Sequence, residues 1–148
     1  AETVAILNDL QAQGHALGHI DGAKARVVIP FPAAPEGATK LVIGVGTGFN
    51  AAPVFETPAG RFVPPSESGH VNLPVRDAAD MRLCDWVSTA HGFPAVEDVL
   101  SGRGIERVFA WLGEEEGEPG EASAADIMAA VAQGGDGRAR RAAAVVSR

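Results

Sequence analysis

Apolar and polar residues follow two different periods along the chain, which predict strands in the first half and helices in the second. Apolar runs at residues 3–7, 26–31 and 40–45 predict three strands, and the unbroken first and third runs are typical of strands covered on both faces. Residues 51–64 contain Pro58-Ala59-Gly60 between two short apolar runs, a pattern that predicts a β-hairpin. Between the first two runs, Leu10 begins a partial helical stripe.

Helical spacing replaces the strand pattern after residue 76. Asp77 is suited to cap a helix in which Ala79, Leu83, Trp86 and Ala90 share a face. Further helices are predicted from Pro94 to Leu100, around the i, i+3, i+4, i+7 series Ile105, Val108, Phe109 and Leu112, from Ala124 to Gln133 behind Ser123, and over the closing run 138–148. Strands followed by helices, with no linker rich in proline and serine, predict an α/β fold.

Composition excludes several classes of function. The chain has 148 residues and a formal net charge of −7 without a Lys/Arg cluster, so nucleic acid and anionic membranes are poor partners. No apolar stretch approaches the roughly 20 residues of a membrane helix. A single cysteine, Cys84, allows neither an internal disulfide nor a zinc cluster and suits a reducing compartment, so we expect a cytoplasmic protein. The absent initiator Met and the opening in a strand pattern indicate a piece of a longer protein.

Two short segments follow predicted strands and offer polar groups. Asn8 and Asp9 stand where the first apolar run ends, which makes them either turn residues or the working end of an active site. The segment GVGTGF, residues 44–49, is a glycine-rich turn whose backbone N–H groups can approach an anion. Phe49 excludes a dinucleotide fingerprint, and the missing Gly-Lys-Ser/Thr ending excludes a P-loop. A tight turn without a ligand remains an alternative.

Three further polar residues are candidates for hydrogen bonding to a ligand. Glu67 and His70 lie in a loop bounded by prolines, residues 64–74, where both can point into one cleft or simply be exposed on a surface turn. A metal site is a weaker interpretation because no second His or Cys lies at ligand spacing. Glu97, in the predicted helix after Pro94, is by itself an ordinary solvated carboxylate.

The order and spacing of these segments resemble the bacterial glucokinase family. The resemblance rests on NDL at residues 8–10, GVGTGF at 44–49, PSESGHVNLP at 65–74 and VEDVLSGRG at 96–104, with Glu97 following His70 by 27 positions. It implies an ATP-dependent hexose kinase with an actin-like, ribonuclease H-like fold, acting in the first step of glycolysis. The expected architecture is a mixed sheet with a β-hairpin followed by helices.

The resemblance also implies a role for each candidate residue. Asp9 is expected to be the general base that takes the proton of the sugar 6-hydroxyl as it attacks the γ-phosphate of ATP. The other implied roles are hydrogen bonding to glucose by Asn8, Glu67, His70 and Glu97, and phosphate binding by the loop of Gly46, Thr47 and Gly48. ATP and Mg²⁺ are the implied cofactors, and a homodimer is the implied assembly. Residues 1–18 would end the small domain, and residues 19–148 would begin the large one.

Several departures from the family pattern matter. Ser68 stands where the family has glycine, and Phe49-Asn50 replaces a Leu-Gly-like pair. The family's first phosphate loop, Asp-x-Gly-Gly-Thr, and its adenosine-binding segment have no counterpart in residues 1–148. We therefore expect little or no kinase activity from the isolated chain. A non-catalytic, sugar-sensing relative is the alternative, although a sensor needs no base such as Asp9.

Overall fold

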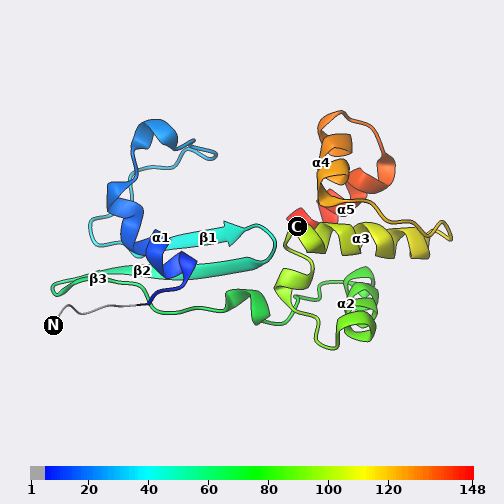
Figure 1. The fold of residues 1–148 in the computed structure, drawn as a ribbon, viewed down its shortest axis with the longest axis horizontal. Helices are drawn as coiled ribbons and strands as arrows, with labels where there is room; N and C mark the ends of the chain where they lie inside the picture. Colours follow the sequence, from blue (N-terminus) through cyan, green and yellow to red (C-terminus); the bar gives the residue numbers. More distant parts are fainter. Residues whose placement is uncertain (1–5) are drawn as a thin grey trace. The chain divides into compact units, whose positions relative to one another are not determined.

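The computed structural model describes residues 6–148, which belong to two compact units. One unit contains the chain up to Gly44 together with Asn50–Glu67, and the other contains Val45–Phe49 and Ser68–Arg148. Figure 1 shows the order of their helices and strands. Residues 3–5 of the strand predicted at 3–7 lie outside the described residues, and Ile6 and Leu7 are irregular backbone ahead of the first helix.

A small sheet with strand order β1-β2-β3 is formed by Lys40–Val45, Phe49–Thr57 and Gly60–Phe62 (Figure 1), and all of its residues except Val45 and Phe49 belong to the first unit. Strands β2 and β3 are antiparallel, with Phe55 opposite Phe62 and Thr57 opposite Gly60. The hairpin predicted around Pro58-Ala59-Gly60 is therefore confirmed, and Gly60 has a φ of 116° that a side chain would disfavour. The part of the chain that the structure describes is α/β, with an antiparallel rather than a mixed sheet.

Helix α1, Asp9–Ala16, covers one face of this sheet. Leu10 of the helix is buried with Val42 of β1 and Val54 of β2 in an apolar cluster, which removes these side chains from water. Gly14 brings the helix close, since a Cβ there would lie 2.8 Å from Cγ1 of Val63. The helix begins directly after Asn8, as expected for the segment that follows the first apolar run.

The strand predicted at residues 26–31 is wrong. After two short 3₁₀ turns, Leu17–His19 and Gly22–Lys24, the backbone at 26–31 is irregular. Val27, Val28 and Phe31 are 75%, 82% and 79% exposed. β-branched residues favour strands, but a strand also needs a neighbour for its backbone N–H and C=O groups. The sheet described above extends no further than β1, β2 and β3, so this run has no such neighbour in it.

The second unit is helical. It contains α2 (Ala78–His91), α3 (Gly102–Glu115), α4 (Ala124–Ala132) and α5 (Gly137–Ser147), with short 3₁₀ turns at Ser68–His70 and Val96–Asp98. The predicted caps are confirmed, because Asp77 accepts two backbone N–H groups of its helix and Ser123 accepts one. The helix predicted from Pro94 to Leu100 is reduced to the single turn at 96–98. None of the helices in the described part is long and apolar enough to cross a membrane.

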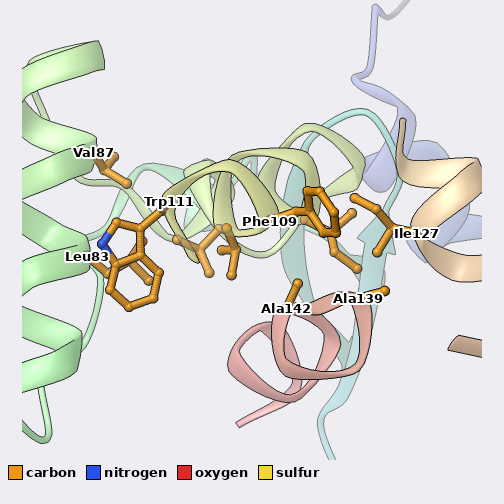
Figure 2. Packing of buried hydrophobic residues seen from close by; sticks show 10 residues of the cluster. Leu83, Val87, Phe109, Trp111, Ile127, Ala139 and Ala142 are labelled. Carbon is orange, nitrogen blue, oxygen red and sulfur yellow. The ribbon is translucent and has the colours of Figure 1, made fainter. Parts of the chain in front are cut away.

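Helix α3 supplies the centre of this unit's core. Figure 2 shows Trp111 of α3 beside Leu83 and Val87 of α2, and Phe109 of α3 near Ile127 of α4. Ala139 and Ala142 bring α5 against the same core, since small side chains allow a close approach between helices. The predicted face of α2 is rotated slightly: Leu83 is buried as expected, but Ala90 is exposed and Val87 takes an inward position.

Candidate functional site

Asn8 and Asp9 form the start of α1, in the first unit. Asn8 is the N-cap: its Oδ1 accepts the N–H of Gln11 at 2.7 Å, and Oε1 of Gln11 accepts the N–H of Asn8 at 3.2 Å. Asp9 is exposed, and its Oδ1 accepts the N–H of Leu10 at 2.9 Å. Both residues thus act as turn and cap residues. The Asp9 carboxylate still has several further lone pairs, and the Asn8 amide NH₂ has two donors. Both residues can therefore still form hydrogen bonds to a ligand.

Glu67 lies exposed at the end of the first unit, in irregular backbone after β3. The segment just before it is held to the sheet, because the Asn50 side-chain amide donates to the Ser66 carbonyl at 2.6 Å. Asn50 itself is part of β2. The sequence departure at position 50 therefore supplies an anchor for the segment that leads to Glu67.

The glycine-rich turn Gly46-Thr47-Gly48 belongs to the second unit and lies against the start of α3. The Gly46 N–H donates to the Gly48 carbonyl at 2.9 Å, which closes the turn. The Gly46 carbonyl accepts the N–H of Gly102 at 2.7 Å, and the Thr47 carbonyl accepts Nε–H of Arg103 at 3.1 Å. All three carbonyl oxygens of the turn therefore have identified donors, two of them from the first residues of α3.

His70 and Glu97 are brought together by a short antiparallel contact between two loops. Asn72 and Ala95 form an isolated bridge. The Leu73 N–H donates to the Pro94 carbonyl and the Val96 N–H donates to the Val71 carbonyl, both at 2.9 Å. These bonds fix the register of the loop at 68–74 against the segment at 94–98, so the 27-residue separation in sequence becomes a contact in space.

The Glu97 carboxylate lies between the His70 imidazole and the glycine-rich turn. His70 Nε2 donates to Oε1 of Glu97 at 3.1 Å. A Cβ added at Gly48 would lie 2.8 Å from Oε2 of Glu97, so glycine at this position makes room for the carboxylate. The His70 side chain is 62% exposed and that of Glu97 is 26% exposed, which leaves both groups accessible to a ligand.

Gly69 is a residue whose importance the sequence did not reveal. It is buried, and a Cβ on it would lie 2.1 Å from the Phe49 carbonyl oxygen and 3.2 Å from Cβ of Glu97. The loop that carries His70 thus packs directly on Phe49, which belongs to the same unit. Its neighbour Ser68 is tolerated there, because no non-glycine residue in the described range has a positive φ.

Gly102 and Arg103 were also missed, although they lie in the quoted motif VEDVLSGRG. The available signal was Ser101, which is suited to cap a helix and does accept the Gly104 N–H at 2.9 Å. A helix that starts at Gly102 directs its first N–H groups away from the helix body, and here one of them binds the turn.

Among the described residues, no group of three or more His, Cys, Asp or Glu side chains is placed to hold a metal ion.

Sequence comparison identifies relatives over most of the chain. A family model described as "Glucokinase" matches residues 1–147. A glucokinase of Pseudomonas paraeruginosa is 31% identical over 135 residues, which cover 90% of this chain and 40% of that protein. A glucokinase of Brucella abortus is 31% identical over 108 residues, which cover 73% of this chain and 31% of that protein.

Comparison with solved structures also finds glucokinases. A glucokinase from an Antarctic psychrotroph matches with a TM-score of 0.76 and 28% identity, covering 90% of this chain and 42% of that one. A glucokinase from Balamuthia mandrillaris, solved in complex with glucose, matches with a TM-score of 0.65 and 26% identity, covering 77% of this chain and 34% of that one. The chain thus spans about two fifths of the length of the first curated relative.

Proposed function

Because the chain belongs to the glucokinase family, we propose that it supplies the central part of an enzyme that transfers the γ-phosphate of ATP to the 6-hydroxyl of glucose. It provides groups for both substrates. His70, Glu97, Asn8 and Glu67 are the proposed partners of the sugar hydroxyls, and Gly46, Thr47 and Gly48 form the proposed phosphate loop. Glucose is the bound sugar in a related solved structure.

The observation that carries this proposal is the position of Glu97. One carboxylate oxygen is paired with His70, and the other lies against Gly48 of the glycine-rich turn. A sugar hydroxyl can both donate and accept, so an imidazole beside a carboxylate offers it a matched pair of partners. A sugar held there has the turn as its immediate neighbour. Phosphoryl transfer depends mainly on such positioning of the two reactants.

Asp9 is the proposed general base. A carboxylate at the start of a helix is held firmly, and the exposed side chain of Asp9 uses only one oxygen to accept the Leu10 N–H. Its second oxygen has the lone pairs needed to orient the 6-hydroxyl and to accept its proton as the new phosphorus–oxygen bond forms and the bond from the γ-phosphorus to the leaving ADP breaks. The proton then resides on the Asp9 carboxyl group until it exchanges with solvent.

The glycine-rich turn supports the nucleotide end of the proposal. Its carbonyl groups are turned toward protein donors, and small residues let the backbone come close to a phosphate. Mg²⁺, when bound with ATP, neutralises charge on the phosphates and is usually held by them together with one or two carboxylates.

We also propose a cytoplasmic location and a homodimer. The division into a small-domain part, residues 1–18, and a large-domain part, residues 19–148, stays a prediction.

The test is a hybrid enzyme in which residues 1–148 replace the matching segment of the Pseudomonas paraeruginosa glucokinase. We expect it to form glucose 6-phosphate from glucose and ATP. Asp9→Asn should lower kcat by about a hundredfold to ten-thousandfold, the range for loss of a general base, while the dissociation constant for glucose stays nearly constant.

A matched control is available in the same unit. Asp21 is also exposed, and its Oδ1 accepts a backbone N–H, that of Ala23, at 3.0 Å. Asp21→Asn should leave kcat unchanged. Equal activity of the Asp9→Asn and parent hybrids would refute the role of Asp9, whereas a parent hybrid that binds glucose without phosphorylating it would favour the sugar-sensing alternative.

A further inference from the structure

The start of α3 holds the glycine-rich turn through its carbonyl groups. The Gly102 N–H binds the Gly46 carbonyl, and Nε–H of Arg103 binds the Thr47 carbonyl. The first contact uses backbone atoms only. The second uses a side chain, so the orientation of the Thr47–Gly48 peptide depends on the identity of residue 103.

A planar trans peptide fixes what this contact does. Its C=O and the N–H of the following residue point in opposite directions, and the structure contains no cis peptide bond in the described range. When the Thr47 carbonyl is held toward Arg103, the Gly48 N–H must point the other way. In the same manner, the bond from Gly102 to the Gly46 carbonyl directs the Thr47 N–H away from α3.

We propose that Arg103 is a positioning residue for phosphate binding, acting through the Thr47 carbonyl so that consecutive backbone N–H groups of the turn face the anion. This inference rests on the proposed function of the turn as a phosphate loop. Consecutive N–H groups that point into one concavity are a general means of binding anions. The guanidinium group contributes through its Nε–H rather than by contact with the phosphate.

Three substitutions separate a donor role from a charge role. Arg103→Gln places an amide nitrogen at the same number of bonds from Cα as Nε, without the charge. Arg103→Met has a methyl group at that position and no donor, whereas Arg103→Lys keeps the charge but has a methylene group where Nε stood. Arg82→Met is the control, since Arg82 is an exposed arginine of α2 whose Nε binds Glu115 at 2.8 Å.

The readout is the backbone amide NMR signals of Thr47 and Gly48 in the ¹⁵N-labelled 148-residue chain, titrated with inorganic tripolyphosphate. We expect both signals to shift on titration of the parent chain. Arg103→Met and Arg103→Lys should raise the dissociation constant roughly threefold to tenfold, as expected for loss of one hydrogen bond. Arg103→Gln and Arg82→Met should bind as the parent does. Binding retained by Lys and lost by Gln would overturn the proposal in favour of direct charge contact.

The response of the parent chain to tripolyphosphate distinguishes failure of this inference from failure of the proposed function. If the parent signals do not respond to tripolyphosphate, the turn is not a phosphate loop and both proposals fall at this site. If they do respond, a loss of affinity in Arg103→Met and Arg103→Lys but not in Arg103→Gln tests the role of Arg103 alone. Binding that is equal in the parent and in the three Arg103 variants would overturn the role of Arg103 and leave the phosphate loop intact.

Discussion

Replacement of Gly69 by alanine tests how the loop that carries His70 is held. The added Cβ would lie 2.1 Å from the Phe49 carbonyl oxygen, which is backbone and cannot rotate away as a side chain can. An ordinary contact between these atoms is more than 3 Å, so the loop and the start of β2 must separate by about 1 Å in a region packed like an organic solid. Overpacking of this kind typically costs about 1–3 kcal/mol.

Gly46→Ala is the matched control. It changes the same residue type in the same unit, but a Cβ at Gly46 meets nothing within 4 Å, and the φ of Gly46 is not among the positive values. Its free energy of unfolding should be unchanged or raised by up to about 1 kcal/mol, because alanine restricts the unfolded chain. The comparison therefore isolates the steric contact from the general effect of removing a glycine.

Urea unfolding monitored by tryptophan fluorescence is a suitable assay. Both tryptophans of the chain, Trp86 and Trp111, lie in the second unit, so the signal reports that unit. With a urea slope of about 2 kcal/mol per molar, a loss of about 2 kcal/mol lowers the midpoint by about 1 M. A Gly69→Ala protein that unfolds at the same urea concentration as the parent and Gly46→Ala would refute the packing described for this loop.

Two predictions concern titratable groups of α2. Hydrogen bonding from the Asp80 N–H, aided by the Arg148 charge, holds the pKa of Asp77 below its usual value of 3.8, so its contribution to stability is present above pH 3.8 and is lost as the pH falls through the lower folded-state pKa. Asp77→Asn keeps the cap without the charge, and the urea midpoint of this variant should lack that part of the acid dependence; identical pH profiles would contradict the assignment. Burial, followed by the charges of Asp80 and Asp85, raises the pKa of the Cys84 thiol, so labelling by a thiol reagent at neutral pH should be slow in the native chain and fast in urea. Rapid labelling of the native chain would show that Cys84 is accessible.

The local pattern predicted most elements because their own residues carry the signal. Lys40–Val45 was predicted as a strand, and Asp77 and Ser123 were predicted as caps, since an apolar run and a capping side chain act within a few residues. The run at 26–31 failed for the opposite reason. Its residues favour a strand, but pairing depends on a neighbour that a local pattern does not reveal.

The candidate site shows the same division. The residue types at positions 67, 70 and 97 were recognised from motif order, and the structure brings His70 and Glu97 within hydrogen-bonding distance. The contact of Glu97 with Gly48, and the clamp of Arg103 on Thr47, join segments about 50 residues apart. Such contacts are formed by the tertiary fold, so the pattern of residues within one segment does not predict them.

A crystal structure of the hybrid enzyme with glucose and a non-hydrolysable ATP analogue tests the central claim most directly. We predict that a carboxylate oxygen of Asp9 lies about 2.6–3.2 Å from the 6-hydroxyl oxygen, the reach of a general base, and that His70 and Glu97 bind other hydroxyls of the same sugar. Glucose bound away from these three side chains would contradict the claim.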